Sequence, residues 1–104
     1  MEDKLLKIIN HYGVLPQLKY LQSEVFELNE AIIQKEYPAI AKDKKPYELE
    51  MYEKKHITEE IADVMVMLCQ LKEHYKIDGN EIMKIMNEKI DRQLKRIEEK
   101  ESDK

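Results

Sequence analysis

The sequence predicts an all-α protein, and its composition, its few helix breakers and its periodicity all support this. Only two of the 104 residues are Gly and three are Pro, so few positions interrupt a helix. Glu, Lys, Leu, Ile and Met, which favour helices, are abundant. Apolar residues recur at intervals of three and four, the period of one helical face. A chain of this length is one domain, so we expect a single domain over residues 1–104 with about four helices.

The first two predicted helices cover about residues 3–11 and 16–35. Leu5 and Ile9 belong to an apolar cluster in the first helix, and Gly13 is expected to end it. Pro16 suits the first turn of the second helix. The apolar stripe of the second helix, which we expect to face the core, comprises Leu18, Leu21, Val25, Leu28 and Ile32.

Residues 36–56 are predicted to form a loop or insert. The segment YPAIAKDKKP (37–46) holds two prolines and a basic cluster, which is typical of a loop. Pro46 is expected to open the next segment, and Thr58 is a candidate N-cap for the helix that follows. Between residues 57 and 75 apolar residues occur nearly all round the helix. We therefore expect this helix to be buried on more than one side, which in so small a protein predicts a subunit interface.

A turn and a final helix complete the chain. Asp78, Gly79 and Asn80 predict the turn, and the helix covers about residues 81–99. Its apolar stripe comprises Ile82, Ile85, Met86, Ile90, Leu94 and Ile97. Residues 100–104 are strongly polar and are expected to form a frayed tail.

Charge, cysteine content and hydropathy exclude several classes of protein. The net charge of −4 and the pI near 5.4 disfavour a general nucleic-acid binder, which would normally carry a positive field. The single cysteine, Cys69, excludes an internal disulfide and a Cys-rich zinc site, and it fits a reducing compartment. No apolar run has the length of a membrane span, and the N-terminus does not resemble a signal peptide. We expect a cytoplasmic protein with no nucleic-acid or membrane partner.

Two pairs of acidic residues lie close to the apolar faces of the predicted helices. Glu24 and Glu27, like Glu60 and Asp63, are three residues apart and therefore share a helix face. Glu60 is near the middle of the apolar face of its helix, and Glu24 is at the edge of the stripe on the second. Unpaired carboxylates against a core are costly, and converging ones repel each other. The spacing leaves two interpretations: the acids bind a hard divalent cation such as Mg²⁺, or they are solvated or paired with lysines.

The acid pairs and their flanking residues resemble a known family. YGVLPQLKYLQSEVFELNEAI (12–32) and HITEEIADVMVMLCQL (56–71) contain the Glu-x-x-Glu and Glu-x-x-Asp pattern of the MazG-like all-α nucleoside triphosphate pyrophosphohydrolases. Leu28, Ala31 and Glu59 match the flanks of this pattern. The resemblance covers roughly residues 12–96. It implies a MazG-like helical bundle in which two long antiparallel helices form the site.

The resemblance also implies an activity, a cofactor and an assembly. It predicts hydrolysis of a nucleoside or deoxynucleoside triphosphate to the monophosphate and pyrophosphate, in nucleotide-pool house-cleaning. It further implies Mg²⁺, with Mn²⁺ as a substitute, and a homodimer or homotetramer. The implied metal ligands are Glu24, Glu27, Glu60 and Asp63, of which Glu27 and Glu60 are the expected catalytic residues. The implied substrate-binding residues are Gln17, Lys89, Arg92 and Arg96.

Some positions depart from the family pattern. Ser23 occupies a place often held by Glu, and the stretch between Glu27 and Glu60 is longer than in most members. The alternative function is a non-catalytic helical oligomeric binding module that retains the fold. The presence of all four acids counts against that alternative.

Overall fold

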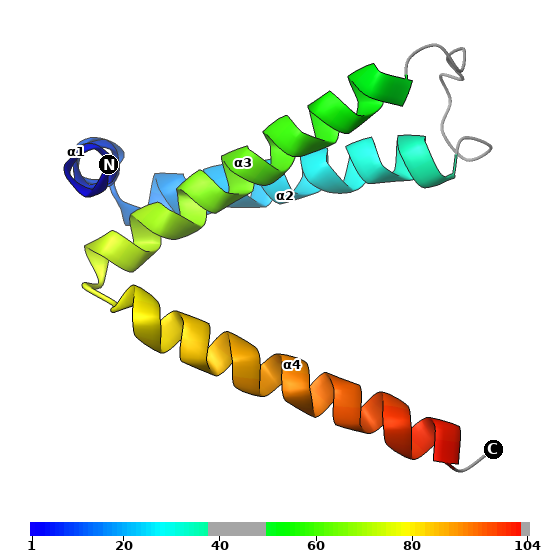
Figure 1. Cartoon of the computed structure of the whole chain (residues 1–104). Coiled ribbons are helices and arrows are strands. Elements are labelled where there is room, and N and C mark those ends of the chain that lie inside the picture. The colour runs from blue at the N-terminus through cyan, green and yellow to red at the C-terminus, as the bar shows by residue number, and fades with distance from the viewer. Residues whose placement is uncertain (38–49, 103–104) are drawn as a thin grey trace. The chain divides into compact units, whose positions relative to one another are not determined.

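A computed structural model of the chain describes residues 1–37 and 50–102. Within these ranges the chain forms helices and no strand, which confirms the predicted all-α class (Figure 1). The helices are α1 (Glu2–Tyr12), α2 (Val14–Glu36), α3 (Glu50–His74) and α4 (Gly79–Ser102). None of the described helices is both long and apolar enough to cross a membrane. The chain divides into two compact units, Met1–His74 and Tyr75–Lys104.

The first unit consists of α1, α2 and α3. Helices α2 and α3 lie side by side and run antiparallel, and α1, seen end-on in Figure 1, packs where α2 begins and α3 ends. The apolar core includes Leu5 and Ile9 of α1, Ala31 of α2 and Met67 of α3. Ile9 is 1% exposed and Leu5 is 7% exposed, so both side chains anchor α1.

A single residue, Gly13, joins α1 to α2. Its N–H donates to the Ile9 carbonyl oxygen at 2.8 Å, and its own carbonyl oxygen accepts from the Gln17 N–H at 3.3 Å. Its φ of 92° lies in the region that glycine adopts without the steric cost of a Cβ. The prediction that Gly13 ends the first helix is confirmed, and the same residue also begins the next.

The face of α2 that is buried differs from the predicted one. The buried residues of α2 are Gln17, Glu24 and Ala31, seven residues apart from one to the next. By contrast, the predicted stripe lies to one side, and its members Leu18 and Val25 are 39% and 40% exposed. Leu21 and Leu28 of the stripe are half-buried, but polar and small side chains occupy the most buried positions of α2.

Helix α3 begins earlier than predicted and is continuous. It starts at Glu50, so residues 50–56 are helical, although we expected them in a loop or insert. Thr58 is not an N-cap, because it lies inside the helix and its Oγ1 donates to the Lys54 carbonyl oxygen at 2.8 Å. Pro46 and most of the predicted loop lie outside the described residues.

Within the single chain, the described part of the 57–75 helix is buried on one side, and burial of its other faces against a second subunit stays a prediction. Glu60, Met67 and Gln70 are the buried side chains among those described in α3. Met65 and Leu68 on other faces are 57% and 51% exposed. The subunit interface that we inferred from this pattern stays a prediction.

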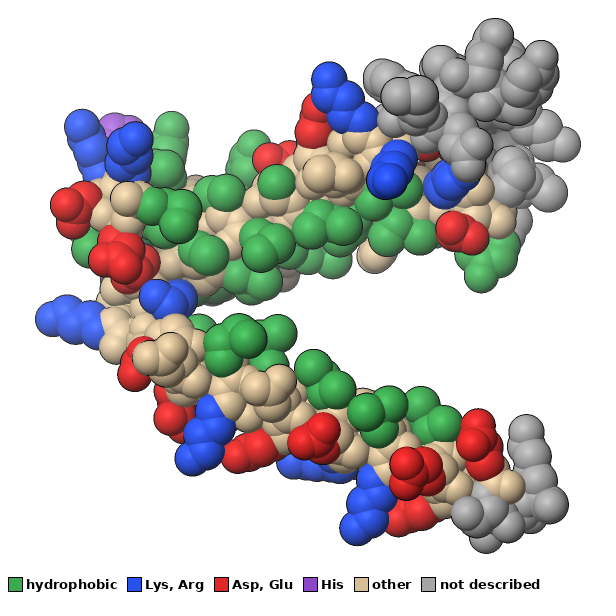
Figure 2. Space-filling view, in the orientation of Figure 1, with side chains coloured by type: hydrophobic (Ala, Val, Ile, Leu, Met, Phe, Trp, Pro, Cys, Tyr) green, Lys and Arg blue, Asp and Glu red, His purple; other side chains and the backbone are tan. Residues whose placement is uncertain are grey.

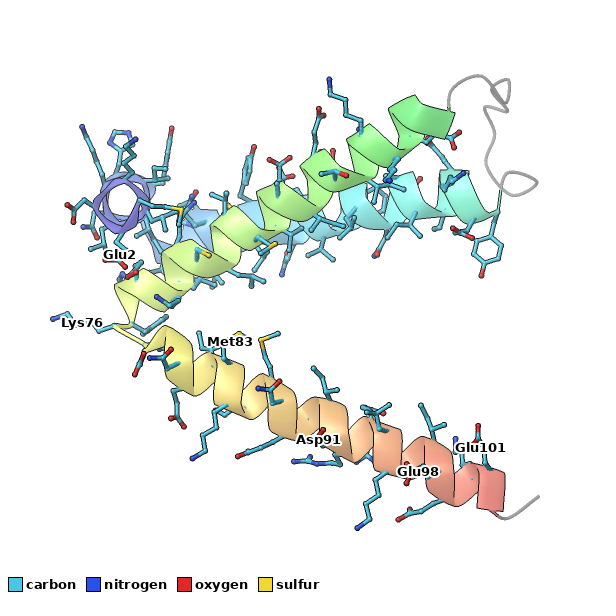
Figure 3. All side chains as sticks on the ribbon, viewed as in Figure 1. Glu2, Lys76, Met83, Asp91, Glu98 and Glu101 are labelled. Carbon is cyan, nitrogen blue, oxygen red and sulfur yellow. The ribbon has the colours of Figure 1, made fainter. Side chains whose placement is uncertain are left out.

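Helix α4 forms the second unit and begins directly after Asp78. The Asp78 Oδ1 atom accepts from the Asn80 N–H at 3.0 Å, as in an N-cap. The helix continues to Ser102, so residues 100–102 are helical, and fraying of this end stays a prediction. Met83 belongs to a row of apolar side chains along one edge of α4, and Asp91 and Glu98 lie away from that row (Figures 2 and 3).

Candidate active site

Acidic side chains from α2 and α3 converge in the first unit. Glu24, Glu60 and Asp63 each offer a carboxylate oxygen, and these oxygens all lie within 4.8 Å of one another. Glu24 and Glu60 are buried, at 5% and 8% exposure, while Asp63 is exposed. The antiparallel packing brings these residues together because Glu24 lies in the buried row of α2 and Glu60 in that of α3.

Two of these carboxylates have an oxygen with no hydrogen-bond partner. Among the described side chains, Oε2 of Glu24 and Oε2 of Glu60 are the buried polar atoms that no protein group satisfies. The nearby imidazole of His56 is 4.0 Å from the Glu60 Oε1 atom and is partly exposed, so it compensates weakly. A buried carboxylate oxygen without a donor is costly. A hard divalent cation with oxygen ligands, such as Mg²⁺, fits this donor set.

The electrostatics of the cluster favour a bound positive charge. Burial raises the pKa of Glu24, and the negative charges of Glu27 and Asp63 raise it further, while hydrogen bonding to Tyr20 lowers it. Burial also raises the pKa of Glu60, with Glu27 adding to the effect and His56 opposing it. Without a cation, both carboxylates are therefore easier to protonate than a free glutamate.

Glu27, the fourth predicted ligand, lies close to the cluster but is exposed. Its charge raises the pKa of both Glu24 and Glu60, which places it near both. Glu27 is not among the three residues whose carboxylate oxygens all lie within 4.8 Å of one another. Glu27 therefore borders the cluster from the solvent side, and its role as a ligand stays a prediction.

An open pocket of about 500 Å³ adjoins the acidic cluster and is lined by residues of α1, α2 and α3. Asp63 belongs to both the pocket and the cluster. The volume is in the range of pockets that hold small-molecule ligands. The other lining residues are Ile8, Tyr12, Pro16, Gln17, Tyr20, Val66, Met67 and Gln70.

A family model described as the MazG nucleotide pyrophosphohydrolase domain matches residues 14–97. The chain belongs to this family. The matched segment includes all of α2 and α3 and thus both acid pairs of the MazG domain, which confirms the resemblance inferred from the motifs. No curated protein and no solved structure matches the chain. Helix α1 precedes the matched segment but supplies Ile8 and Tyr12 to the pocket wall.

Gln17, which the sequence predicts as a substrate-binding residue, is buried in the wall of this pocket. Its Nε2 atom donates to Oε1 of Gln70 at 2.8 Å. Gln70, Tyr12 and Tyr20 were not among the predicted site residues. A usable signal was present, because Gln17 precedes Glu24 by seven residues and Gln70 follows Asp63 by seven. Residues seven apart share a helix face, so the MazG acid pairs themselves point to both glutamines.

The predicted basic residues of the MazG domain lie on α4. Lys89, Arg92 and Arg96 are exposed there and are three and four residues apart, so they share one side of the helix. These cations belong to the second unit, whereas the acidic cluster belongs to the first. Their role in binding substrate stays a prediction.

Proposed function

We propose that this protein is a Mg²⁺-dependent nucleoside triphosphate pyrophosphohydrolase. It would convert an NTP or dNTP and water to the corresponding monophosphate and pyrophosphate, in house-cleaning of the nucleotide pool. We further propose that it acts in the cytoplasm as a homodimer or homotetramer. The observation that carries the proposal is the cluster of Glu24, Glu60 and Asp63, with two unsatisfied buried oxygens, beside a ligand-sized pocket in a MazG domain.

The four acids divide into holding and proton-accepting roles. Glu24, Glu60 and Asp63, together with Glu27, would hold Mg²⁺, or Mn²⁺ in its place. When bound, the cation would supply neutralisation of phosphate charge and a lowered pKa of water. Glu27, the solvent-facing member, accepts the proton of the attacking water at a carboxylate oxygen, while Glu60 fixes the buried side of the cluster.

The reaction needs charge neutralisation and positioning more than covalent chemistry. The water oxygen bonds to phosphorus as the bond of the α–β phosphoanhydride breaks, and pyrophosphate leaves with the electron pair of that bond. Lys89, Arg92 and Arg96 bind the negative oxygens of the leaving pyrophosphate. Gln17 contacts the nucleoside part of the substrate from the pocket wall.

The test is pyrophosphate release from a panel of NTPs and dNTPs in the presence of Mg²⁺. We expect turnover of at least one substrate, and Glu60→Gln should lower kcat by about a hundredfold or more. The matched control is Glu59→Gln, which removes an exposed acid from the same turn and should leave kcat unchanged. Circular dichroism should show equal helical content in the three proteins.

Two outcomes would refute the proposal. If no triphosphate in the panel is hydrolysed with Mg²⁺ or Mn²⁺, the alternative of a non-catalytic helical oligomeric binding module is favoured. If Glu60→Gln is as active as the wild type, the acidic cluster is not the site.

A further inference from the structure

The Gln17–Gln70 pair is the main polar feature of the pocket outside the acidic cluster. Gln17 is 9% exposed and Gln70 is 2% exposed, and both line the pocket. The Gln17 Nε2 atom donates to Gln70 Oε1 at 2.8 Å. Gln70 Nε2 in turn donates to Met67 Sδ at 3.6 Å. This chain of contacts fixes Gln70 with its oxygen toward Gln17, and it fixes Gln17 with its nitrogen toward Gln70.

The fixed orientation leaves the carbonyl oxygen of Gln17 available to a ligand. Within the described chain, the buried side-chain oxygens that lack a partner belong to Glu24 and Glu60. The side-chain hydrogen bond that Gln17 makes within the described chain uses its Nε2 atom and not Oε1, and Gln17 lines the pocket. Nε2 of Gln17 also keeps a second hydrogen, because an amide nitrogen carries two. The planar side-chain amide of Gln17 therefore presents one hydrogen-bond acceptor and one donor to the pocket.

The distance from this amide to the acids suits a nucleotide. Gln17 and Gln70 are each seven residues from an acid of the cluster, Glu24 on α2 and Asp63 on α3. Seven residues of helix correspond to about 10 Å along the axis. Because the two helices are antiparallel, both glutamines are displaced in the same direction. A ligand with phosphates at the acids would thus extend its other end toward the amide pair.

The remaining walls of the pocket suit a flat heterocycle. Tyr12 and Tyr20 contribute aromatic rings, and Ile8, Val66 and Met67 contribute apolar side chains. Nucleobases have apolar faces and polar edges, and their faces stack on aromatic rings. A planar amide can pair with a base edge through adjacent donor and acceptor atoms.

We propose that Gln17, held in place by Gln70, reads the edge of the nucleobase, with its carbonyl oxygen accepting a hydrogen bond from a base N–H. This inference rests on the proposed function, because it assumes that the phosphates of the same ligand lie at the acids. It assigns Gln17 as a specificity-determining residue and Gln70 as a positioning residue. It also predicts that a substrate without a base edge is a poor ligand.

The experiment uses free nucleosides, which carry no phosphate and therefore need no cation. The full-length protein is titrated with the four common ribonucleosides and with ribose, and the side-chain amide signals of Gln17 and Gln70 are followed by NMR. We expect nucleosides to shift these signals, with affinities that differ among bases, and ribose to leave them unchanged. Replacing the N–H on the edge of the preferred base by N-methyl should weaken binding about tenfold, as expected for one lost hydrogen bond.

Variants separate reading of the base from mere structural support. Gln17→Met should lower the affinity for the preferred nucleoside about tenfold. Gln70→Met should reduce the discrimination between nucleosides, because Gln17 then loses its fixed orientation. Gln22→Met, a change at an exposed glutamine of α2, should alter neither quantity. A purely structural role for the pair would change stability and leave discrimination unaltered.

The outcomes distinguish this inference from the proposed function. If ribose shifts the amide signals as nucleosides do, if nucleosides cause no shift, or if Gln17→Met binds them as the wild type does, the inference is overturned even where pyrophosphate is released. If nucleosides bind as expected while no triphosphate is hydrolysed, the inference is supported and the proposed activity fails.

Discussion

Replacing Glu60 by Gln should stabilise the protein in the absence of divalent cations, although it should impair the proposed activity. Glu60 is 8% exposed, and its buried Oε2 atom has no hydrogen-bond partner among the described residues. Leaving such a group unsatisfied costs about 1–3 kcal/mol, and glutamine removes this cost because its amide is neutral and can donate to the neighbouring carboxylates. The partly exposed His56, 4.0 Å away, returns less than about 1 kcal/mol. The free energy of unfolding at pH 7 in EDTA should therefore rise by about 1–2 kcal/mol.

The gain in unfolding free energy that Glu60→Gln produces should increase as the pH rises. Burial, the Glu27 charge and the Asp63 charge raise the pKa of Glu60 in the folded chain. Below the ordinary glutamate pKa of about 4.3, Glu60 is protonated in both folded and unfolded chains and carries no penalty. As the pH rises through the raised pKa of the folded chain, the wild type loses this stability and Glu60→Gln does not. The two proteins should thus be most alike in acid and diverge toward neutral pH.

Thermal unfolding followed by circular dichroism, in EDTA across this pH range, measures the difference. For a domain of this size, the expected increase in Tm at pH 7 is about 5–10 °C. The control Glu59→Gln removes an exposed charge and should change stability by less than about 0.5 kcal/mol. A Tm of Glu60→Gln below that of the wild type at pH 7, or pH curves that stay parallel, would show that Glu60 is not an unsatisfied buried carboxylate.

Three further changes test the metal site and the packing around it. Mg²⁺ should raise Tm by binding the folded state, and Asp63→Asn should weaken this rise. The control Asp91→Asn on α4 should leave the rise unchanged. Equal Tm responses of the two variants in a Mg²⁺ titration would contradict the metal assignment. Ile9→Ala removes a side chain that is 1% exposed and should lower the free energy of unfolding, measured in urea, by about 2–4 kcal/mol. The control Ile8→Ala, at a more exposed residue, should lower it by less than about 1 kcal/mol. Gly13→Ala forces an L side chain to a φ of 92° and should cost about 1–2 kcal/mol, measured by thermal unfolding; an unchanged Tm would show that the joint relaxes.

The sequence was sufficient to predict the helices and three acids of the cluster. Spacing alone placed Glu60 on the inner face of its helix and Glu24 at the edge of an apolar stripe, and both side chains are buried. The same spacing made Asp63 a candidate ligand, and the family motif supported that choice. Periodicity located α1, α2 and α4 to within two residues at their starts, because apolar spacing and breakers such as Gly13 are local signals.

The register between α2 and α3 could not be predicted from local patterns. Apolar periodicity predicts the buried face only where the most apolar positions are also the most buried. In α2 the buried residues are instead Gln17, Glu24 and Ala31. Polar residues buried in a core break that assumption. The contact between Gln17 and Gln70 joins positions 53 apart in the chain and depends on how the two helices are aligned. Thr58 was misassigned for a related reason, since its hydroxyl bonds as well inside a helix as at its start.

The one-residue joint at Gly13 has a consequence for ligand entry. With a single amino acid between them, α1 and α2 have almost no slack, and the hydrogen bonds of Gly13 to Ile9 and Gln17 on either side restrain the joint further. The wall that carries Ile8 and Tyr12 is thereby set at a constant angle before any molecule arrives. A ligand would bind to a preformed pocket wall, so little of its binding free energy would be lost to ordering the chain. Inserting a few glycines at this joint would let α1 move relative to α2. Ligand binding would then be slower, although no residue that lines the pocket would have changed.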